Sequence, residues 1–241
     1  TKSAQVKSSL IFAGIGSENY STISFDKNTR DHTENILQFI EADIKINKDI
    51  MVRKSLFKKG LNLIVPGDIS NASFIIAGAA IIPGSQIKIS NLLYNNTRMG
   101  FVNTLIKMGA CISVDNVRTS FCEKVCDITA SYSPKLKGVT IRGDDLLIMI
   151  DEIPIFSVVA AIAKGKTVIS GARELRFKES DRLNAIYKNL SAMGANIIQK
   201  EDGLEIFGGK KLYNTNINTF GDHRILMAFE IMHLYLNNKL L

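Results

Sequence analysis

The sequence has no tryptophan and only three cysteines, and these shortages exclude several classes of protein. The cysteines, Cys111, Cys122 and Cys126, are odd in number and lack the paired spacing of a zinc site. Cys122 and Cys126 offer at most half of a metal site, with only three histidines in the chain to complete it. We therefore expect reduced thiols, as in cytosolic proteins, and neither a disulfide framework nor a metal site.

Long apolar runs and targeting segments are missing as well. No stretch approaches the roughly 20 apolar residues of a membrane-spanning helix, and neither a signal peptide nor a transit peptide is recognisable. We therefore expect a cytoplasmic protein with no membrane partner. The chain begins at Thr1 rather than at methionine, which predicts that a preceding segment was removed or lies outside this sequence.

The remaining composition is that of a soluble globular protein with surplus positive charge. Hydrophobic residues make up 46% of the 241 residues and charged residues 22%, which suits one large domain or two of ordinary size. The net charge of +7 favours anionic partners. Nucleic acid is the crude inference from charge. However, there is no basic low-complexity run or recognised motif and only 7% aromatic residues, so we expect no nucleic-acid partner.

One stretch of the chain, Arg173–Arg182, concentrates charge in the sequence RELRFKESDR. It lies between a strand-like run at 167–170 and a helix-like run at 183–193, whose apolar residues recur with helical spacing. At such a junction the free N–H groups and the dipole of the first helical turn add to the cations, and together they favour anions. Ser180 or Asp181 is the expected N-cap. The alternative is a solvated loop that pairs with itself.

A supersecondary pattern recurs along the chain at intervals of about 70 to 80 residues. Each occurrence is a mostly apolar helix, a turn and, where the chain continues, a strand. The helices are expected at residues 3–14, 70–82, 151–163 and 222–234, and the strands at 21–25, 86–89 and 167–169.

A second helix follows the strand in three of these units, after a polar and basic junction. The junctions are at residues 28–32, 95–98 and 173–182, and the helices end at 41–44, 108–112 and 193–197. Glycine in two of these endings suits the position just after a helix. We predict an α/β (α+β) fold of repeated units, each a helix, a strand, a helix and two strands, with apolar helices under mixed sheets. The alternative is the ordinary alternation of any α/β protein.

Turn residues at 65–68 mark a plausible domain boundary. We therefore predict one domain portion at 1–65, which holds a single repeat, and a second at 66–241, which holds the rest. A domain with one repeat of this size is small and normally needs partners to close its core.

Several short motifs together resemble the enolpyruvyl transferases, specifically the 5-enolpyruvylshikimate-3-phosphate synthase family. They extend over essentially the whole chain in the family's order. The motifs are SAQVKS (3–8), TRDHTE (29–34), VPGDIS (65–70), IDEIP (150–154), RFKESDR (176–182) and GDHR (221–224). The sister family that acts on UDP-N-acetylglucosamine shares the fold but is not known for the last two motifs.

The resemblance implies a fold, a reaction and a partner set. The family's fold is two similar domains of three repeated units each, with the active site in the cleft between them. The implied reaction transfers the enolpyruvyl group of phosphoenolpyruvate to the 5-hydroxyl of shikimate 3-phosphate and releases phosphate. It implies no cofactor, and it implies a monomer for the full-length protein.

For shikimate 3-phosphate, the resemblance implies contacts from the first motifs of the chain. Ser3 would bind the phosphate, and Gln5 would contact both substrates. Ala4 stands where some members have a second serine, so one hydrogen bond is absent or moved. Thr29 stands where the family has a phosphate-binding serine, and Arg30 is a further phosphate ligand.

For the chemistry and for phosphoenolpyruvate, the resemblance implies five residues from the later motifs. Asp151 would contact the shikimate hydroxyls and accept the proton of the attacking one. Lys178 would bridge the two substrates, and Glu179 would give and retake the proton at the phosphoenolpyruvate methylene. Arg182 and Arg224 would bind the carboxylate and phosphate of phosphoenolpyruvate.

Other polar residues near these motifs have simpler interpretations. Asp222 is expected as a helix N-cap, and Asp181 as a cap or the partner of a neighbouring cation. His223 is expected to support the site without contacting substrate, and Arg98 to be an echo of the repeat. Glu174 stands where other members have asparagine, so we assign it no role.

Members of the family are much longer than this chain, with further site residues before and after the part that it matches. The resemblance therefore predicts a fragment that is weakly active or inactive alone. Two other hypotheses remain open at this stage. One is an enolpyruvyl transferase for UDP-N-acetylglucosamine, and the other is a non-enzymatic domain that binds anions or RNA with the same repeats.

Overall fold

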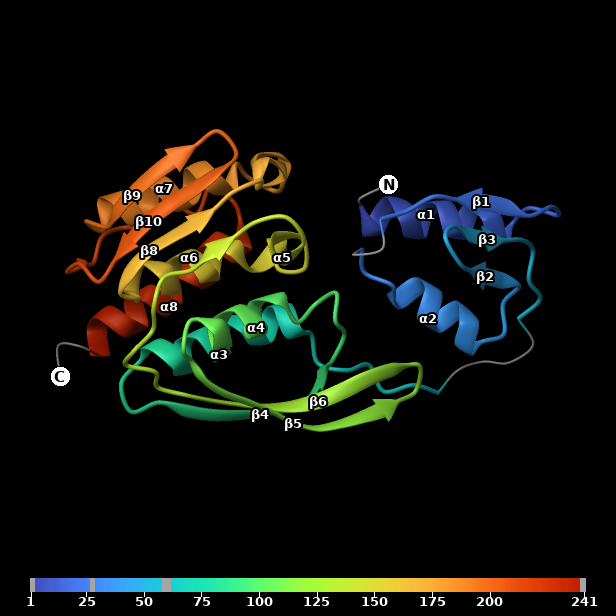
Figure 1. The fold of residues 1–241 in the computed structure, drawn as a ribbon, viewed down its shortest axis with the longest axis horizontal. Helices are drawn as coiled ribbons and strands as arrows, with labels where there is room; N and C mark the ends of the chain where they lie inside the picture. The colour runs from blue at the N-terminus through green and yellow to red at the C-terminus, as the bar shows by residue number, and fades with distance from the viewer. Residues whose placement is uncertain (1–2, 27–28, 58–61, 239–241) are drawn as a thin grey trace.

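The computed structural model describes residues 3–26, 29–57 and 62–238, and it contains three helix–sheet units of the same order (Figure 1). In the first unit (residues 3–52) a three-stranded antiparallel sheet has the order β1-β3-β2. Its elements are α1 Ala4–Ile15, β1 Ser21–Ile23, α2 His32–Phe39, β2 Ile44–Ile46 and β3 Ile50–Val52.

The second unit (residues 69–131) repeats this arrangement with longer strands. Its antiparallel sheet has the equivalent order β4-β6-β5. Asp68 begins the unit as the N-cap of the first helix, because its carboxylate accepts hydrogen bonds from the backbone N–H groups of Ser70 and Asn71. The elements are α3 Ile69–Ile81, β4 Gln86–Leu93, α4 Gly100–Lys107, β5 Cys111–Ser120 and β6 Glu123–Ser131.

The third unit (residues 153–208) has the same order and one additional strand, so its sheet runs β7-β8-β10-β9. Its elements are α6 Ile153–Ile162, β8 Gly165–Ile169, α7 Arg182–Ala192, β9 Asn196–Lys200 and β10 Gly203–Gly208. Before it come β7 Thr140–Ile141, α5 Asp144–Leu147 and the 3₁₀ turn η1 Ile150–Glu152. A second 3₁₀ turn, η2 Arg173–Phe177, follows β8, and α8 His223–Asn238 closes the chain.

The predicted order of helix, strand, helix and two strands is confirmed in all three units. The predicted mixed sheets are wrong for the first two units, whose named strands, within the described residues, pair with one another antiparallel. In the third unit β7 pairs parallel with β8, because the chain crosses through α5 and α6 between them. The structure therefore adds one strand that the sequence pattern did not indicate.

The predicted glycines after the second helices are also confirmed. Gly109 and Gly194 have backbone φ angles of +94° and +86°, a left-handed conformation that glycine adopts without steric cost. The first unit departs from this pattern, since Glu41 follows α2 with a φ angle of +59°. The backbone turn is thus the same in the three units even where the residue type differs.

Buried hydrophobic residues form two separate clusters. The smaller lies in the first unit and consists of Ile11, Ile23, Leu37, Ile50 and Val52. The larger one extends through the main body (residues 69–238), where α6 packs against both α3 and α8. In Figure 1 these three helices lie between the sheet of the second unit and the sheet of the third unit.

The structure leaves the domain boundary at 65–68 as a prediction. Gly67 forms a parallel bridge with Leu92, so this segment already contacts the second unit. Among the helices of residues 3–26, 29–57 and 62–238, none combines the length and the apolar composition that a membrane span requires. The cysteines Cys111, Cys122 and Cys126 are all free.

Candidate functional site

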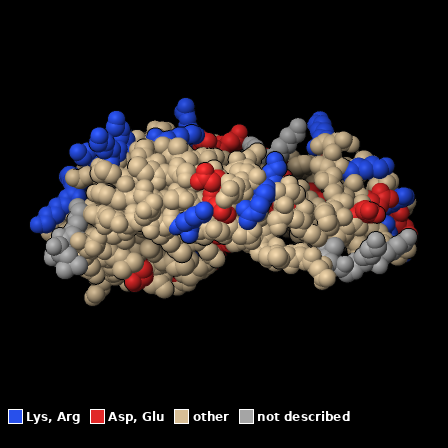
Figure 2. Space-filling model, turned by 90° about the horizontal axis from the view of Figure 1, so that it is seen from below, with Lys and Arg blue, Asp and Glu red and all other residues tan. Residues whose placement is uncertain are grey.

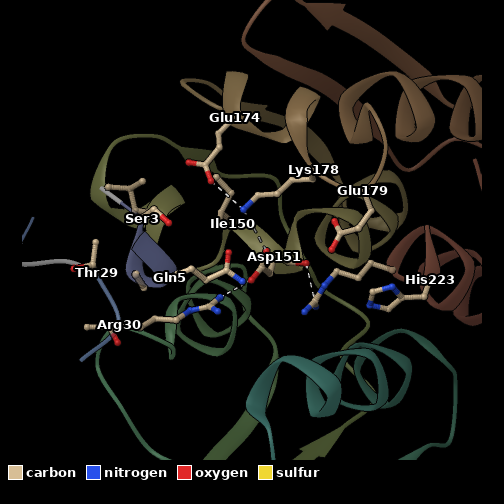
Figure 3. A pocket seen from close by; sticks show the side chains of 14 residues that line it. Ser3, Gln5, Thr29, Arg30, Ile150, Asp151, Glu174, Lys178, Glu179 and His223 are labelled. Atoms are coloured by element: carbon tan, nitrogen blue, oxygen red, sulfur yellow. Dashed lines mark hydrogen bonds and ion pairs between the residues drawn. The ribbon is translucent and has the colours of Figure 1, made fainter. Parts of the chain in front are cut away.

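A cavity of about 450 Å³ lies where the first unit faces the main body. The start of α1 and the junction before α2 form one wall, and η1, the charged stretch and the start of α8 form the other. Figure 3 shows the side chains of Arg30 and Lys178 reaching toward Asp151 at the centre of the cavity. All the predicted site residues except Arg182 line it: Ser3, Gln5, Thr29, Arg30, Asp151, Lys178, Glu179 and Arg224.

Asp151 is the centre of this charge cluster. Its carboxylate oxygens lie 2.5 Å from Arg30 Nη2, 3.9 Å from Lys178 Nζ and 3.6 Å from Arg182 Nη1. Arg224 Nη1 donates to the Asp151 backbone carbonyl at 3.4 Å. Burial raises the pKa of Asp151, but the charges of Arg30, Arg224 and Lys178 outweigh burial and hold that pKa below its usual value. Asp151 is therefore an ionised carboxylate whose partners come from both walls of the cavity.

Arg182 lies behind the cavity wall, fully buried at the first turn of α7. Its Nε donates to Asp222 Oδ2 at 2.8 Å, and its Nη2 donates to Glu179 Oε2 at 2.6 Å. Its Nη1 is buried and has no hydrogen-bond partner within the described residues. Arg182 thus holds Glu179 at the cavity and keeps one donor available on the side of Asp151.

Asp222 is more than the predicted N-cap. It accepts the backbone N–H of Arg224 at 2.9 Å, as a cap does, and it also accepts from Ser180 Oγ at 3.1 Å and from Arg182. Burial raises the pKa of Asp222, but the hydrogen bond and charge of Arg182 bring it below its ordinary value. The sequence did not indicate this pair, because its two members are far apart along the chain.

The charged stretch itself does not form a continuous helix. Residues 173–177 form the turn η2, and α7 begins only at Arg182, after Asp181 caps it by accepting from the Asn184 backbone N–H at 3.0 Å. Asp181 also pairs with Arg176 at 2.8 Å, so both predicted roles of Asp181 are present. The interpretation as a loop that only pairs with itself fails, since Lys178, Glu179 and Arg182 contact or line the cavity.

The hydroxyl groups on the other wall are already engaged. Ser3 is the N-cap of α1, with its Oγ accepting from the Val6 backbone N–H at 3.3 Å, and it lines the cavity as well. Thr29 Oγ1 donates to the Asp26 carbonyl at 2.6 Å. A ligand at Thr29 therefore has to compete with a backbone acceptor. Asn28 of the predicted junction lies outside the described residues.

Several lining residues were not predicted to contact a ligand. Glu174 lines the cavity and pairs with Lys178 Nζ at 2.9 Å, and His223 and Thr97 also line it. The signal for Thr97 was present, because the sequence Asn-Thr-Arg occurs at both 28–30 and 96–98. Glu174 and His223 carried no comparable repeat.

Arg98 does more than repeat the sequence of the first junction, because it takes part in a hydrogen-bond network. Its Nη2 donates to Asp68 Oδ1 at 2.7 Å and to Ser70 Oγ at 2.6 Å. Burial, and then the charge of Arg30, lower the pKa of Arg98 below its ordinary value. Next to this network the buried Glu152 has a raised pKa, chiefly because of burial, which the hydrogen bond from Ser70 partly opposes. Arg98 thus belongs to the charged surroundings of the cavity.

A buried ion pair supports the first wall. Lys7 Nζ lies 2.5 Å from Glu34 Oε1, and both side chains are almost completely buried. Lys7 is on α1, close to Ser3 and Gln5, while Glu34 is on α2, just after Thr29. The pair therefore joins the two helices whose starts line the cavity.

Comparisons with known proteins agree on one family. The family model described as EPSP synthase (3-phosphoshikimate 1-carboxyvinyltransferase) matches residues 1–241. The 3-phosphoshikimate 1-carboxyvinyltransferase of Persephonella marina is 41% identical over 236 residues, which cover 96% of this chain and 55% of that protein. The protein of the same name from Thermodesulfovibrio yellowstonii is 44% identical over 232 residues, covering 95% of this chain and 54% of the relative. The chain thus spans about half the length of the curated relatives that it matches.

Solved structures give the same result for the fold. A structure of EPSP synthase from Acinetobacter baumannii matches with a TM-score of 0.88 and 37% identity, over 96% of this chain and 54% of that chain. The enolpyruvyl transferase NikO from Streptomyces tendae matches with a TM-score of 0.67 at 14% identity, over 89% of this chain and 50% of that chain, and shares the fold alone.

Proposed function

The chain belongs to the EPSP synthase family, and from this premise we propose that the protein carrying it transfers an enolpyruvyl group. The donor is phosphoenolpyruvate, the acceptor is the 5-hydroxyl of shikimate 3-phosphate, and phosphate is released on the way to chorismate and the aromatic amino acids. The observation that carries the proposal is the convergence of Arg30, Lys178 and Arg182 on Asp151 from both walls of the cavity. We also propose a cytoplasmic enzyme that acts as a monomer.

The charges of the cavity suit two anionic substrates. Phosphoenolpyruvate carries a carboxylate and a phosphate, and shikimate 3-phosphate carries one of each. Arginine meets such groups with two parallel N–H donors, which adds geometric specificity to the charge. In this proposal Arg182 and Arg224 bind phosphoenolpyruvate, Gln5 and Lys178 contact both substrates, and Arg30 binds the phosphate of the acceptor.

Two of the carboxylates that line the cavity, Glu179 and Asp151, have separate roles in the reaction. The acceptor hydroxyl attacks the central carbon of phosphoenolpyruvate while the methylene carbon takes a proton and becomes a methyl group. Loss of phosphate and of one methyl proton from the tetrahedral intermediate then restores the enolpyruvyl group. We assign proton delivery and removal at this carbon to Glu179, which Arg182 holds in place.

Asp151 is the proposed partner of the attacking hydroxyl. Its lowered pKa keeps it ionised, so it can accept a hydrogen bond or a proton from that hydroxyl. When an anionic substrate draws Arg30 and Lys178 away, Asp151 loses cationic partners and becomes more basic. Substrate binding would thus prepare Asp151 for its role. Ser3 and Thr29 complete the proposed binding of the acceptor phosphate.

The proposal is tested on the intact protein that carries this chain. Phosphate release from phosphoenolpyruvate is measured with shikimate 3-phosphate or UDP-N-acetylglucosamine as the acceptor, and only the first is expected to support turnover. Glu179→Gln is expected to lower kcat by ~10²–10⁴ with little change in substrate affinity, because it removes proton transfer and keeps the shape. Turnover with the nucleotide sugar alone, or full activity of Glu179→Gln, would contradict the proposal.

A further inference from the structure

The sequence Asn-Thr-Arg occurs twice, at residues 28–30 and 96–98, each time just before the second helix of a unit. Thr29 belongs to the first unit and Thr97 to the second, yet both line the same cavity. The two arginines differ. Arg30 lines the cavity and pairs with Asp151, whereas the guanidinium of Arg98 is bound by Asp68 and Ser70.

The two junctions are joined directly by Asn95. Its Nδ2 donates to Asp31 Oδ1 at 2.7 Å, and its Oδ1 accepts from the backbone N–H of Thr97 at 2.9 Å. A carboxylate can only accept and a backbone N–H can only donate, so these partners determine which way the amide of Asn95 points. The orientation of Asn95 is therefore unambiguous.

This orientation decides which hydrogen-bonding capacity Thr97 can offer. Thr97 Oγ1 also lies 2.6 Å from Asn95 Oδ1, which can only accept, so the hydroxyl proton of Thr97 is donated to Asn95. The Thr97 oxygen then has only lone pairs to present to a ligand. A fully ionised phosphate or a carboxylate has no proton to donate to it, whereas a substrate hydroxyl has one.

We propose that Thr97 is a substrate-contacting residue that accepts a hydrogen bond from a ring hydroxyl of shikimate 3-phosphate, with Asn95 as the residue that positions it. The inference rests on the proposed function and extends it to specificity. The first junction, whose half-buried Arg30 lines the cavity, binds the anionic part of the acceptor. The second junction, whose Arg98 is turned to Asp68 and Ser70, reads the neutral hydroxyl groups.

Thr97→Val tests the contact, because valine keeps the shape of threonine and removes its oxygen. Binding is measured by calorimetry on the intact protein with two probes, shikimate 3-phosphate and the same phosphorylated ring acid without its two free hydroxyls. Thr97→Val is expected to weaken binding of shikimate 3-phosphate roughly three- to tenfold and to leave the dideoxy probe unchanged. Thr97→Ser, which keeps the hydroxyl, is expected to bind both probes as the unmodified protein does.

Thr29→Val is the matched control at the equivalent position of the first junction. The Thr29 hydroxyl proton is donated to the Asp26 carbonyl, which a phosphate has to displace, so any effect of this change comes through the phosphate that both probes share and is expected to be equal for the two. An unchanged affinity of Thr97→Val for shikimate 3-phosphate, or an equal loss for both probes, overturns the assignment. Thr97→Ser that binds as weakly as Thr97→Val overturns it too. If the unmodified protein turns over shikimate 3-phosphate but the Thr97 variants do not bind as expected, the proposed function stands and the assignment of Thr97 falls. If it binds neither probe, both proposals fall.

Discussion

The first unit and the main body have the same order of elements but very different cores. In the main body α6 is buried along almost its whole length, because α3 and α8 pack on it. In the first unit α1 packs on β1 and β3, and it leaves Val6, Leu10 and Phe12 exposed at 47%, 45% and 60%. A repeated sequence pattern therefore specifies a local unit, while the depth of the core depends on what packs against its apolar helix.

The buried ion pairs of the two regions also differ, because the pair in the main body has more hydrogen-bond partners than the pair in the first unit. In the main body Asp222 is held by Arg182, Ser180 and the backbone N–H of Arg224. In the first unit Lys7 has Glu34 and the ring of Phe25, whose centroid lies 5.0 Å from its Nζ. Glu34 Oε2 makes no hydrogen bond within the described residues. Both regions bury charge, but only the main body surrounds its charge with a network.

The largest expected effect follows from removing the cation of that network. Arg182→Met leaves Asp222 buried without its charged partner, and we expect the free energy of unfolding to fall by ~3–5 kcal/mol. Turnover is expected to fall as well, because Glu179 loses its hydrogen bond. Urea denaturation measures the stability. Arg173→Met is the control from the same stretch, since Arg173 is largely exposed and is expected to change stability by less than about 0.5 kcal/mol. Equal effects of the two changes would contradict a structural role for the buried pair.

A smaller and more local effect is expected from Lys7→Met in the first unit. The variant leaves Glu34 buried and unpaired, which we expect to cost ~3 kcal/mol, toward the lower end for such pairs. Because the small core is a separate cluster, we expect it to open independently, so the loss is expected in amide exchange at Ile50 and Val52, with exchange at Phe156 unchanged. Replacing both partners, Lys7→Met with Glu34→Leu, is expected to recover most of the loss. Faster amide exchange in both regions would show that they unfold as one unit, which would contradict an independent core in the first unit.

The contrast between the regions also shows what the sequence could predict. Elements set by local spacing were predictable, such as the apolar face of α7 and the glycines Gly109 and Gly194 after their helices. The short strand β7 has too few residues to show a pattern, so its parallel pairing with β8 was not predicted. Local order is encoded within a few residues, which is why most element bounds were close to the observed ones.

The site was predictable by type of residue but not by partner. The motifs indicated Asp151, Lys178, Glu179 and Arg182, and the structure brings the first three together at one cavity, with Arg182 directly behind its wall. The pairing of Arg182 with Asp222 was not predictable, because no periodicity relates positions separated so far in sequence. Such contacts depend on how whole units pack against each other, so they need the tertiary structure.

Acid is expected to weaken the main body through Asp222 and Asp151. Both have pKa values lowered in the folded state, so their stabilisation is complete above the unfolded pKa of about 3.9 and is lost as pH falls below it through the folded pKa. Asp222→Asn is expected to be less stable near neutral pH and to lose less stability below about pH 4. The measurement is urea denaturation across this range.

Asp43 in the first unit also has a lowered pKa, through Tyr20 and then Arg53, but it is near the surface, so salt should weaken its contribution. If added salt also reduces the loss of stability that acid causes through Asp222 and Asp151, the contrast between these buried carboxylates and Asp43 is contradicted.

The smallest expected effect concerns the contact between the two regions away from the cavity. Figure 2 shows charged side chains on one face of the molecule at several places along its length. Figure 1 shows that the turn between β5 and β6 reaches α2. There Glu123 Oε1 lies 2.7 Å from His32 Nδ1, and the rings of Phe121 and Phe39 have centroids 4.0 Å apart. These contacts join α2 to the main body independently of the charges around Asp151.

Glu123→Gln removes the charge of this contact and keeps its shape. We expect the first unit to lose about 0.5–1.5 kcal/mol, the value of one hydrogen bond, because an amide can still accept from His32 or Asn35 only weakly. Amide exchange at Ile50 and Val52 should speed up slightly, with Phe156 again unchanged. Lys124→Gln, at the exposed neighbouring residue, should change nothing measurable. If amide exchange at Phe156 speeds up as much as exchange at Val52, the contact stabilises both regions equally. The first unit would then not depend on this contact more than the main body does.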